Sequence, residues 1–180
     1  MKQKCLMLGA GHTPLKRKFA APTSALESDT EWVSLDMNPD CKPDILFELG
    51  LIEKSQQIPV AAESFNEIHA YDVLEHYGTQ GDYKGFFMGF RELWRILKPG
   101  GLFIGNTPMW NVMWTWGDPG HCRVITWGTL GYLTRWMDEN IGSSPATDYR
   151  RYVDQYWWEL HASEEDNNTG GYFFALKKVT

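Results

Sequence analysis

The sequence is poor in cysteine, has no long apolar run and carries a deficit of basic residues. Its three cysteines, Cys5, Cys41 and Cys122, are far apart and form no CxxC pair. This usage indicates neither a disulfide framework nor a zinc site, so no metal ligands are expected. No run approaches the roughly 20 apolar residues of a membrane span, and the apolar stretch at residues 5–8 is too short for a signal-peptide core. We expect a soluble cytoplasmic protein without a membrane span.

The shortage of positive charge narrows the range of partners. Seventeen Lys and Arg residues stand against 23 Asp and Glu residues, which leaves a net charge of −6. Such a surface does not favour phosphate backbones, so nucleic acid is not an expected partner. The 180 residues are 43% hydrophobic, enough for one compact domain over residues 1–180. The sequence carries no signature of an oligomeric state.

The chain does contain a series of short apolar segments in its first half. Four of them are typical of buried strands, because each is apolar or alternates apolar with polar residues. They cover residues 4–8, 31–36, 45–49 and 65–71. The first ends at Gly9-Ala10-Gly11, a turn that needs backbone freedom, and the second is followed by the turn signal Asn38-Pro39. Asp72 is expected to open a helical stretch after the fourth.

The middle of the chain has the clearest helical pattern. From Tyr83 to Lys98 large apolar residues recur on one helical face and charged residues occupy the opposite face. The sequence Lys98-Pro99-Gly100-Gly101 should end this helix, because proline cannot continue it and glycine permits a reversal. A fifth strand is predicted over residues 102–106.

The second half adds one more helix and a terminal hairpin. Thr126 can cap a helix that runs to about Asn140. Strands are predicted over residues 156–162 and 171–177, joined by the polar loop 163–170. Strands that alternate with helical segments predict an α/β fold with a mostly parallel sheet, whose ligands bind at the carboxyl ends of the strands.

Three features should meet at that edge of the sheet: Gly9-Ala10-Gly11, Asp36 and Asp72. Glycines there let a ligand approach the main chain, and an acid that closes the second strand can accept hydrogen bonds from both hydroxyls of a ribose. Each feature alone has an ordinary explanation as a turn former or a helix cap. Their order and spacing together predict a nucleoside-containing cofactor.

Several segments resemble the class I S-adenosylmethionine-dependent methyltransferases, over nearly the whole chain. They are CLMLGAG at 5–11, VSLDMN at 33–38, SFNEIHAYDVLEHY at 64–77 and RELWRILKPGG at 91–101. The resemblance implies a Rossmann-like, doubly wound and mostly parallel sheet with a C-terminal antiparallel hairpin, in a three-layer α/β/α sandwich. It also implies an enzyme that uses S-adenosyl-L-methionine as its methyl donor.

The resemblance places cofactor contacts on particular residues. Gly9-Ala10-Gly11 would pass beneath the methionine part of the cofactor, Asp36 would hold its ribose, and Met37 would lie against the adenine. Glu48-Leu49 falls where family members contact the adenine edge. Asp72 falls where they flank the methionine moiety.

The chain departs from the family pattern just after the first strand. The family's third glycine is replaced by Thr13, and no long amphipathic pattern follows, so the first helix is expected to be short and started by Thr13-Pro14. His12, Lys16 or Arg17 would then bind the cofactor's carboxylate. Alternatively, the basic residues only form part of a solvent-exposed surface.

Methyl transfer from a sulfonium depends chiefly on alignment of donor and acceptor, so few side chains are strictly required. A hydroxyl or ammonium acceptor would be helped by a general base. Asp72 and His121 are the catalytic candidates, and His76 is a substrate-side candidate. The alternative for His76 is a structural role in the helix expected after the fourth strand.

The substrate side is expected over residues 108–140, an insert followed by a helix. The stretch GHCRVIT at 120–126 resembles an HxRxxT element that many family members carry there, so His121 and Arg123 either face the substrate or pin the loop. Trp110 and Trp114 line the acceptor pocket, cover the open face of the sheet or form a subunit contact.

Rival functions fit the sequence less well. A nicotinamide-dependent oxidoreductase needs Gly or Ala where Pro14 stands, and its ribose acid comes about 20 positions on, earlier than Asp36. A nucleic-acid base methyltransferase would carry an Asp/Asn-Pro-Pro-aromatic signature in place of Tyr71-Asp72-Val73-Leu74. A methyltransferase-like scaffold without activity is the remaining alternative. The favoured function is methyl transfer to a small-molecule or sugar acceptor.

Overall fold

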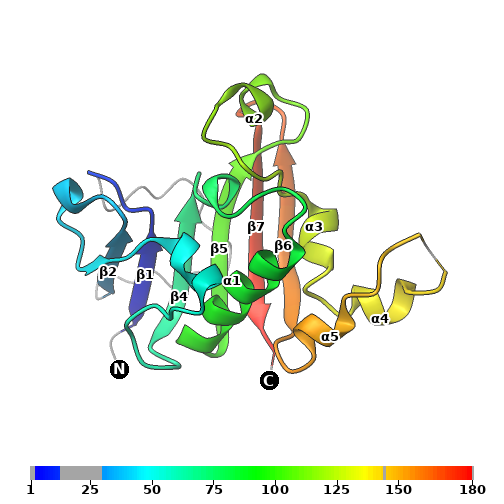
Figure 1. The fold of residues 1–180 in the computed structure, drawn as a ribbon, viewed down its shortest axis with the longest axis horizontal. Coiled ribbons are helices and arrows are strands. Elements are labelled where there is room, and N and C mark those ends of the chain that lie inside the picture. The colour runs from blue at the N-terminus through cyan, green and yellow to red at the C-terminus, as the bar shows by residue number, and fades with distance from the viewer. Residues whose placement is uncertain (1–2, 13–29, 144, 180) are drawn as a thin grey trace.

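A seven-stranded sheet forms the centre of the computed structural model, which describes residues 3–12, 30–143 and 145–179 (Figure 1). The strands lie in the order β3-β2-β1-β4-β5-β7-β6; β1 to β5 pair in parallel, whereas β7 is antiparallel to β5 and β6. The predicted doubly wound sheet with its C-terminal hairpin is confirmed. The strands are β1 (Lys4–Leu8), β2 (Glu31–Asp36), β3 (Ile45–Leu46), β4 (Phe65–Tyr71), β5 (Leu97–Pro108), β6 (Trp158–Asp166) and β7 (Gly171–Lys178).

The strand order reverses between β1 and β4, the two strands at the point where the sheet is wound in opposite directions. Both are buried along nearly their whole length, which explains why apolar residues dominate them. In a sheet of this kind a crevice opens outside the carboxyl ends of the strands at the reversal. The ends of β1, β2 and β4 are therefore neighbours, as the sequence predicts.

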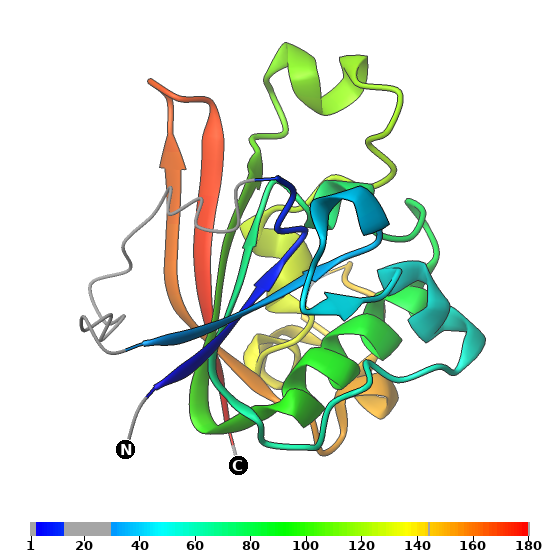
Figure 2. The same cartoon turned by 90° about the vertical axis from the view of Figure 1, so that its left-hand side faces the viewer.

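The helices α1, α3, α4 and α5 lie on one face of the sheet, and α2 stands beyond the carboxyl ends of the strands (Figures 1 and 2). No helix among the described residues covers the opposite face, and the short helix predicted to start at Thr13 falls outside the described ranges. The helices are α1 (Tyr83–Ile96), α2 (Met113–Gly117), α3 (Trp127–Gly131), α4 (Trp136–Asn140) and α5 (Arg150–Val153).

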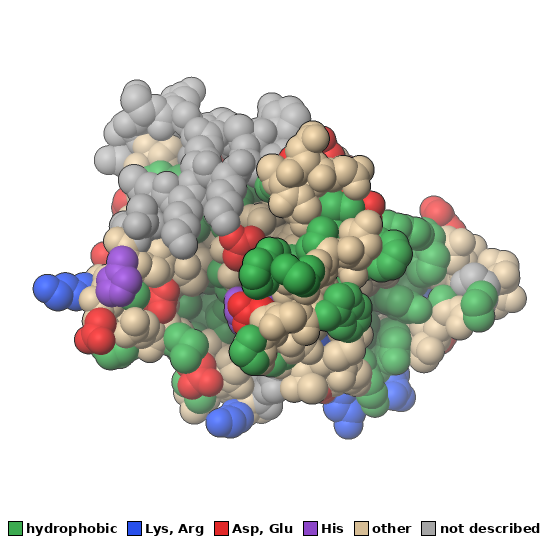
Figure 3. Space-filling view, turned by 90° about the horizontal axis from the view of Figure 1, so that it is seen from above, with side chains coloured by type: hydrophobic (Ala, Val, Ile, Leu, Met, Phe, Trp, Pro, Cys, Tyr) green, Lys and Arg blue, Asp and Glu red, His purple; other side chains and the backbone are tan. Residues whose placement is uncertain are grey.

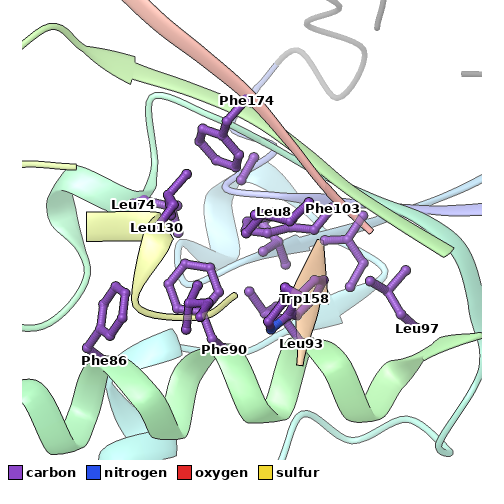
Figure 4. Packing of buried hydrophobic residues seen from close by; sticks show 14 of the residues in the cluster. Leu8, Leu74, Phe86, Phe90, Leu93, Leu97, Phe103, Leu130, Trp158 and Phe174 are labelled. Carbon is purple, nitrogen blue, oxygen red and sulfur yellow. The ribbon is translucent and has the colours of Figure 1, made fainter. Parts of the chain in front are cut away.

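Helix α1 anchors the main core, as its apolar face predicts. The Asp82 side chain caps it by accepting a hydrogen bond from the Gly85 N–H at 3.1 Å. The ring of Phe90 packs against the sheet, with its centroid 5.9 Å from that of Phe103 and 6.3 Å from that of Trp158 (Figure 4). Burial of each such aromatic side chain stabilises the fold by roughly 1.5–3 kcal/mol.

The boundary between α1 and β5 differs from the prediction. The helix ends at Ile96, and β5 starts at Leu97, where the sequence predicts Lys98 and Leu102. Leu97 pairs with Phe65 of β4 before a register shift, so the strand begins ahead of the Pro-Gly-Gly segment and absorbs it as a bulge.

The helix predicted from Thr126 to about Asn140 is broken into α3 and α4. Its start is as predicted, because the Thr126 side chain forms a capping box with Thr129. The break follows from a tertiary contact, because the Trp158 N–H donates to the Leu133 carbonyl at 3.0 Å. A local hydrogen bond from the Thr134 hydroxyl to the Gly131 carbonyl, at 2.9 Å, accompanies it. Pairing with β6 overrides helix propensity there.

Three smaller elements also differ from the sequence prediction. β3 stops at Leu46 because its partner β2 ends at Asp36, and a 3₁₀ turn over Leu49–Lys54 follows. The helical stretch expected after Asp72 is only the 3₁₀ turn Leu74–His76. β6 extends to Asp166, since polar residues are tolerated on an edge strand that faces solvent.

Candidate functional site

The turn after β1 has the backbone geometry that its glycines predict. Gly9 and Gly11 both adopt the left-handed region, with φ of 58° and 59°. A β-carbon on Gly9 would lie 2.5 Å from Val73 Cγ2, whereas one on Gly11 would meet none of the described residues within 4 Å. Gly9 is therefore required for close packing of the turn against the chain after β4.

Asp36 stands at the end of β2 with its carboxylate fixed by the backbone. The Gly11 N–H donates to Oδ2 at 2.7 Å, and the Asn38 N–H donates to Oδ1 at 2.9 Å. The Phe47 N–H donates to the Asp36 carbonyl at 3.0 Å, which also ties the chain after β3 to this point. The carboxylate thus joins the glycine turn to the end of the second strand.

A cavity of about 320 Å³ lies against Asp36, within the usual size range of small-molecule sites. Five residues predicted to bind the cofactor line it, together with His76 from the substrate side. The five are Gly9, Asp36, Met37, Glu48 and Leu49. Phe47, Val73, Tyr77 and Thr79 are among the other lining residues.

The remaining residues of the predicted cofactor set lie outside this cavity. Ala10 is buried behind the turn, and its N–H donates to the Leu35 carbonyl at 3.2 Å. Gly11 touches the site through its hydrogen bond to Asp36. His12 is exposed. Lys16 and Arg17 fall outside the described residues.

Asp72 occupies a strained position directly after β4. Its φ of 55° lies in the left-handed region, which a non-glycine residue adopts at some energetic cost but which Asp tolerates better than most. The Asn106 side-chain amide donates to Asp72 Oδ1 at 2.7 Å, and the Asp72 N–H donates to the Asn106 carbonyl at 3.1 Å. The end of β5 therefore fixes the direction of the Asp72 carboxylate.

A second cavity, of about 590 Å³, lies on the other side of Asp72. It sits between the end of β5, the loop before α2 and the tip of the β6–β7 hairpin, and Trp114 lines it as predicted for the substrate side. Trp110 does not line it; its carbonyl accepts a hydrogen bond from the Trp116 indole at 2.8 Å. The lining includes Asp72, Asn106, Thr107, Trp114, Asn168 and Phe173.

Two polar groups at the wall of this second cavity are unsatisfied. Asn106 and Thr107 are only 5% and 1% exposed, and Asn106 Oδ1 and Thr107 Oγ1 have no hydrogen-bond partner among the described residues. Burial of such groups without a partner is unfavourable by about 1–3 kcal/mol each. Both residues line the cavity, but the two oxygens themselves are shielded from solvent.

The loop after α2 brings His121 beside His76, with ring centroids 4.7 Å apart. Arg123 is buried and turns away from both cavities. Its guanidinium donates to the carbonyls of Thr79 and Asp82, each at 2.8 Å, and lies over the Phe86 ring. These contacts indicate that Arg123 holds the loop after α2 in place.

Sequence reasoning missed several residues that line the two cavities. Phe47 follows a strand whose end the apolar pattern misplaces. Asn106 and Thr107 belong to the fifth strand. Their position at its carboxyl end could have marked them as candidate site residues. Asn168 lies in the polar hairpin loop, and nothing in the sequence places that loop beside β5.

The carboxyl edge of the sheet, which carries both cavities, also exposes large apolar side chains (Figure 3). Trp110, Met113, Trp114 and Trp116 of the segment after β5 are all more than half exposed. Acidic side chains lie beside hydrophobic ones on this face (Figure 3). None of the described helices is long and apolar enough to cross a bilayer.

No family model matches the sequence, and no curated protein sequence is significantly similar to it. Solved structures do share its fold. A methyltransferase that depends on S-adenosylmethionine, from Archaeoglobus fulgidus, has a TM-score of 0.55 at 14% identity, covering 98% of this chain and 86% of its own. Another, from Mesorhizobium loti, has a TM-score of 0.56 at 13% identity, covering 98% and 91%. The chain has the fold of S-adenosylmethionine-dependent methyltransferases.

Proposed function

We propose that the chain transfers a methyl group from S-adenosyl-L-methionine to a small-molecule acceptor. The observation that carries the proposal is the Asp36 carboxylate, which two backbone N–H groups hold at the rim of the first cavity. A carboxylate in this place accepts hydrogen bonds from both hydroxyls of a ribose. The fold shared with S-adenosylmethionine-dependent methyltransferases supports the same cofactor.

The residues around the first cavity fit an adenosyl group. Phe47 and Leu49 offer apolar surface to a base, and Met37, which is 68% exposed, can lie over it. The exposed Glu48 can accept a hydrogen bond from an exocyclic amine. Gly9, which lines the cavity, has no side chain to keep a ligand from the main chain.

When bound, the cofactor supplies an electrophilic methyl group on a sulfonium, so the chain's task is chiefly to align donor and acceptor. Val73 lines the first cavity and Asp72 the second, so consecutive residues of the chain after β4 contribute to both cavities. Asp72, oriented by Asn106, is the side chain best placed to accept a proton from an acceptor in the second cavity.

The second cavity supports a small acceptor with hydroxyl or amine groups. Rotation of the Asn106 and Thr107 side chains, which line the cavity, would let their buried oxygens accept hydrogen bonds from such groups and would remove the cost of leaving these oxygens without a partner. Trp114 offers an aromatic face on which a sugar or planar ring can stack. A sugar or another hydroxylated small molecule fits this combination.

Calorimetric titration with S-adenosylhomocysteine tests the cofactor side. Asp36→Asn should weaken binding roughly 10- to 100-fold, because the ribose loses charged hydrogen bonds. Asp40→Asn is the matched control: it removes an exposed acid four positions later that does not line the cavity. Equal affinity in the two variants would contradict the assignment of Asp36.

Label transfer tests the acceptor side. We expect methyl-labelled S-adenosyl-L-methionine, incubated with a cell extract, to label the small-molecule fraction, and Asp72→Asn to reduce labelling while S-adenosylhomocysteine affinity is retained. Label confined to protein or nucleic acid would refute a small-molecule acceptor. Cofactor binding with no transfer into any fraction would instead support a scaffold.

A further inference from the structure

Three potential metal ligands converge where the loop after α2 meets the 3₁₀ turn after β4. They are Glu75, His76 and His121, and one ligand atom from each lies within 4.8 Å of the others. Backbone contacts hold the two segments together: the Cys122 and Arg123 N–H groups donate to the Glu75 carbonyl at 2.7 and 3.1 Å. These backbone hydrogen bonds between the loop and the turn therefore bring the three side chains together.

His121 is oriented with one nitrogen toward the interior and the other toward a carboxylate. Its side chain is 8% exposed, and Nδ1 is buried with no hydrogen-bond partner among the described residues. Nε2 lies 3.9 Å from Asp118 Oδ2, and the Gly120 N–H holds Oδ1 of the same carboxylate at 2.7 Å. A carboxylate behind an imidazole is the usual outer partner of a metal-binding histidine.

His76 shows the matching arrangement. Its Nδ1 lies 2.9 Å from the Gly120 carbonyl and can donate to it, which leaves Nε2 as the nitrogen with a free lone pair. The His76 and His121 rings meet edge to face at 73°. Glu75, only 2% exposed, brings a carboxylate to the same point.

We propose that Glu75, His76 and His121 form a binding site for a divalent transition-metal ion such as Zn²⁺. Two imidazoles and one carboxylate suit zinc or iron and do not suit Mg²⁺ or Ca²⁺, which prefer oxygen ligands. Ligands about 2.1 Å from zinc lie roughly 3.4 Å apart, so the three groups need to close by little more than about 1 Å. The exposed His76 has the freedom to do so.

The site lies at the border of the first cavity, because His76 lines that cavity. Three protein ligands leave a fourth coordination position open for water or another small ligand. The site does not depend on the proposed methyl transfer. The sequence gives no indication of this site, because His121 lies far along the chain from Glu75 and His76 and the three residues include no cysteine pair.

Calorimetry with Zn²⁺ on chelator-treated protein without an added histidine tag tests the proposal. We expect one Zn²⁺ per chain, with His121→Ala and His76→Ala weakening binding at least roughly 100-fold and Asp118→Asn weakening it roughly 10- to 100-fold. His161→Ala is the matched control, since His161 also faces a carboxylate, Glu159, at 3.7 Å but belongs to no ligand cluster among the described residues.

Circular dichroism of each variant without metal separates loss of ligands from loss of fold. Because His76 is exposed, His76→Ala should fold normally even if Glu75→Gln does not. Co²⁺ provides a second readout: its visible absorption should change on binding to the parent chain and to His161→Ala, and not to His121→Ala. Absence of Zn²⁺ binding by the parent chain, or equal binding by His121→Ala, would overturn the proposal.

Discussion

Gly9 and Val73 approach so closely that a β-carbon on Gly9 would lie 2.5 Å from Val73 Cγ2. The contact joins the turn after β1 to the chain after β4, and both residues line the first cavity. Gly11, two positions on, shares the left-handed backbone, but a β-carbon there would meet none of the described residues within 4 Å. A comparison of alanine substitutions at the two glycines therefore separates the effect of backbone strain from that of a steric clash.

Gly9→Ala should destabilise the protein more than Gly11→Ala. Both variants pay for a left-handed alanine, roughly 1–2 kcal/mol, and only Gly9→Ala adds overpacking of roughly 1–3 kcal/mol. Denaturant unfolding at equilibrium measures the difference. Equal losses in the two variants would mean that Val73 moves aside.

Arg123→Ala should destabilise the fold by about 2–3 kcal/mol, because the change removes a buried guanidinium together with its charged hydrogen bonds to the carbonyls of Thr79 and Asp82. Arg151→Ala, at an exposed position, should change the free energy of unfolding by no more than about 0.5 kcal/mol. If Arg123→Ala were as stable as the parent chain, the loop would be held by its other contacts alone.

The three thiols should react with an alkylating reagent in the order Cys122, Cys41, Cys5. Cys122 is exposed. The pKa of Cys41 is raised by desolvation and by Asp36 and Asp40, which lowers its thiolate fraction. Cys5 is buried, with its pKa raised to about 12, chiefly by desolvation. Mass spectrometry of timed samples gives the order, and early labelling of Cys5 would contradict the burial of β1.

Cys5 should also make stability fall at alkaline pH. Between its unfolded pKa of 9.0 and its folded pKa of about 12, the native state keeps a proton that the unfolded state has lost. The native state then binds more protons, so the free energy of unfolding decreases as pH rises. Cys5→Ala should flatten this decrease relative to the parent chain, whereas Cys122→Ala should leave it unchanged. Parallel curves for the parent chain and Cys5→Ala would refute the linkage.

The sequence predicts much of the fold because local pattern and tertiary environment agree there. β2 and β4 begin and end where alternation and turn residues place them, and α1 starts at Tyr83 as its periodicity requires. The prediction and the structure disagree where a residue distant in the sequence determines the local structure. Trp158 interrupts the second predicted helix at Leu133, and the pairing of Leu97 with Phe65 starts β5 early.

The same distinction applies to the site. The position of Gly9, Asp36 and Asp72 at one edge of the sheet could be predicted because each ends or follows a strand, and strand ends meet in a doubly wound sheet. Asn168 and Glu75 could not, since the first reaches its cavity only through the hairpin's position beside β5 and the second is one buried acid within a short turn. The neighbours of a loop side chain can be identified only once the arrangement of the strands and helices is known.

The adjacency of Asp72 and Val73 gives the molecule a modular architecture. The first cavity is lined by the ends of β1 to β3 and by the turn after β4, whereas beyond Asp72 the walls of the second cavity come from β5, the hairpin tip and the segment around Trp114. Exchanging the hairpin tip would reshape the second cavity and leave the first intact. If the chain transfers methyl groups as proposed, changes in these two surface segments would alter its acceptor and leave its contacts with the cofactor unchanged.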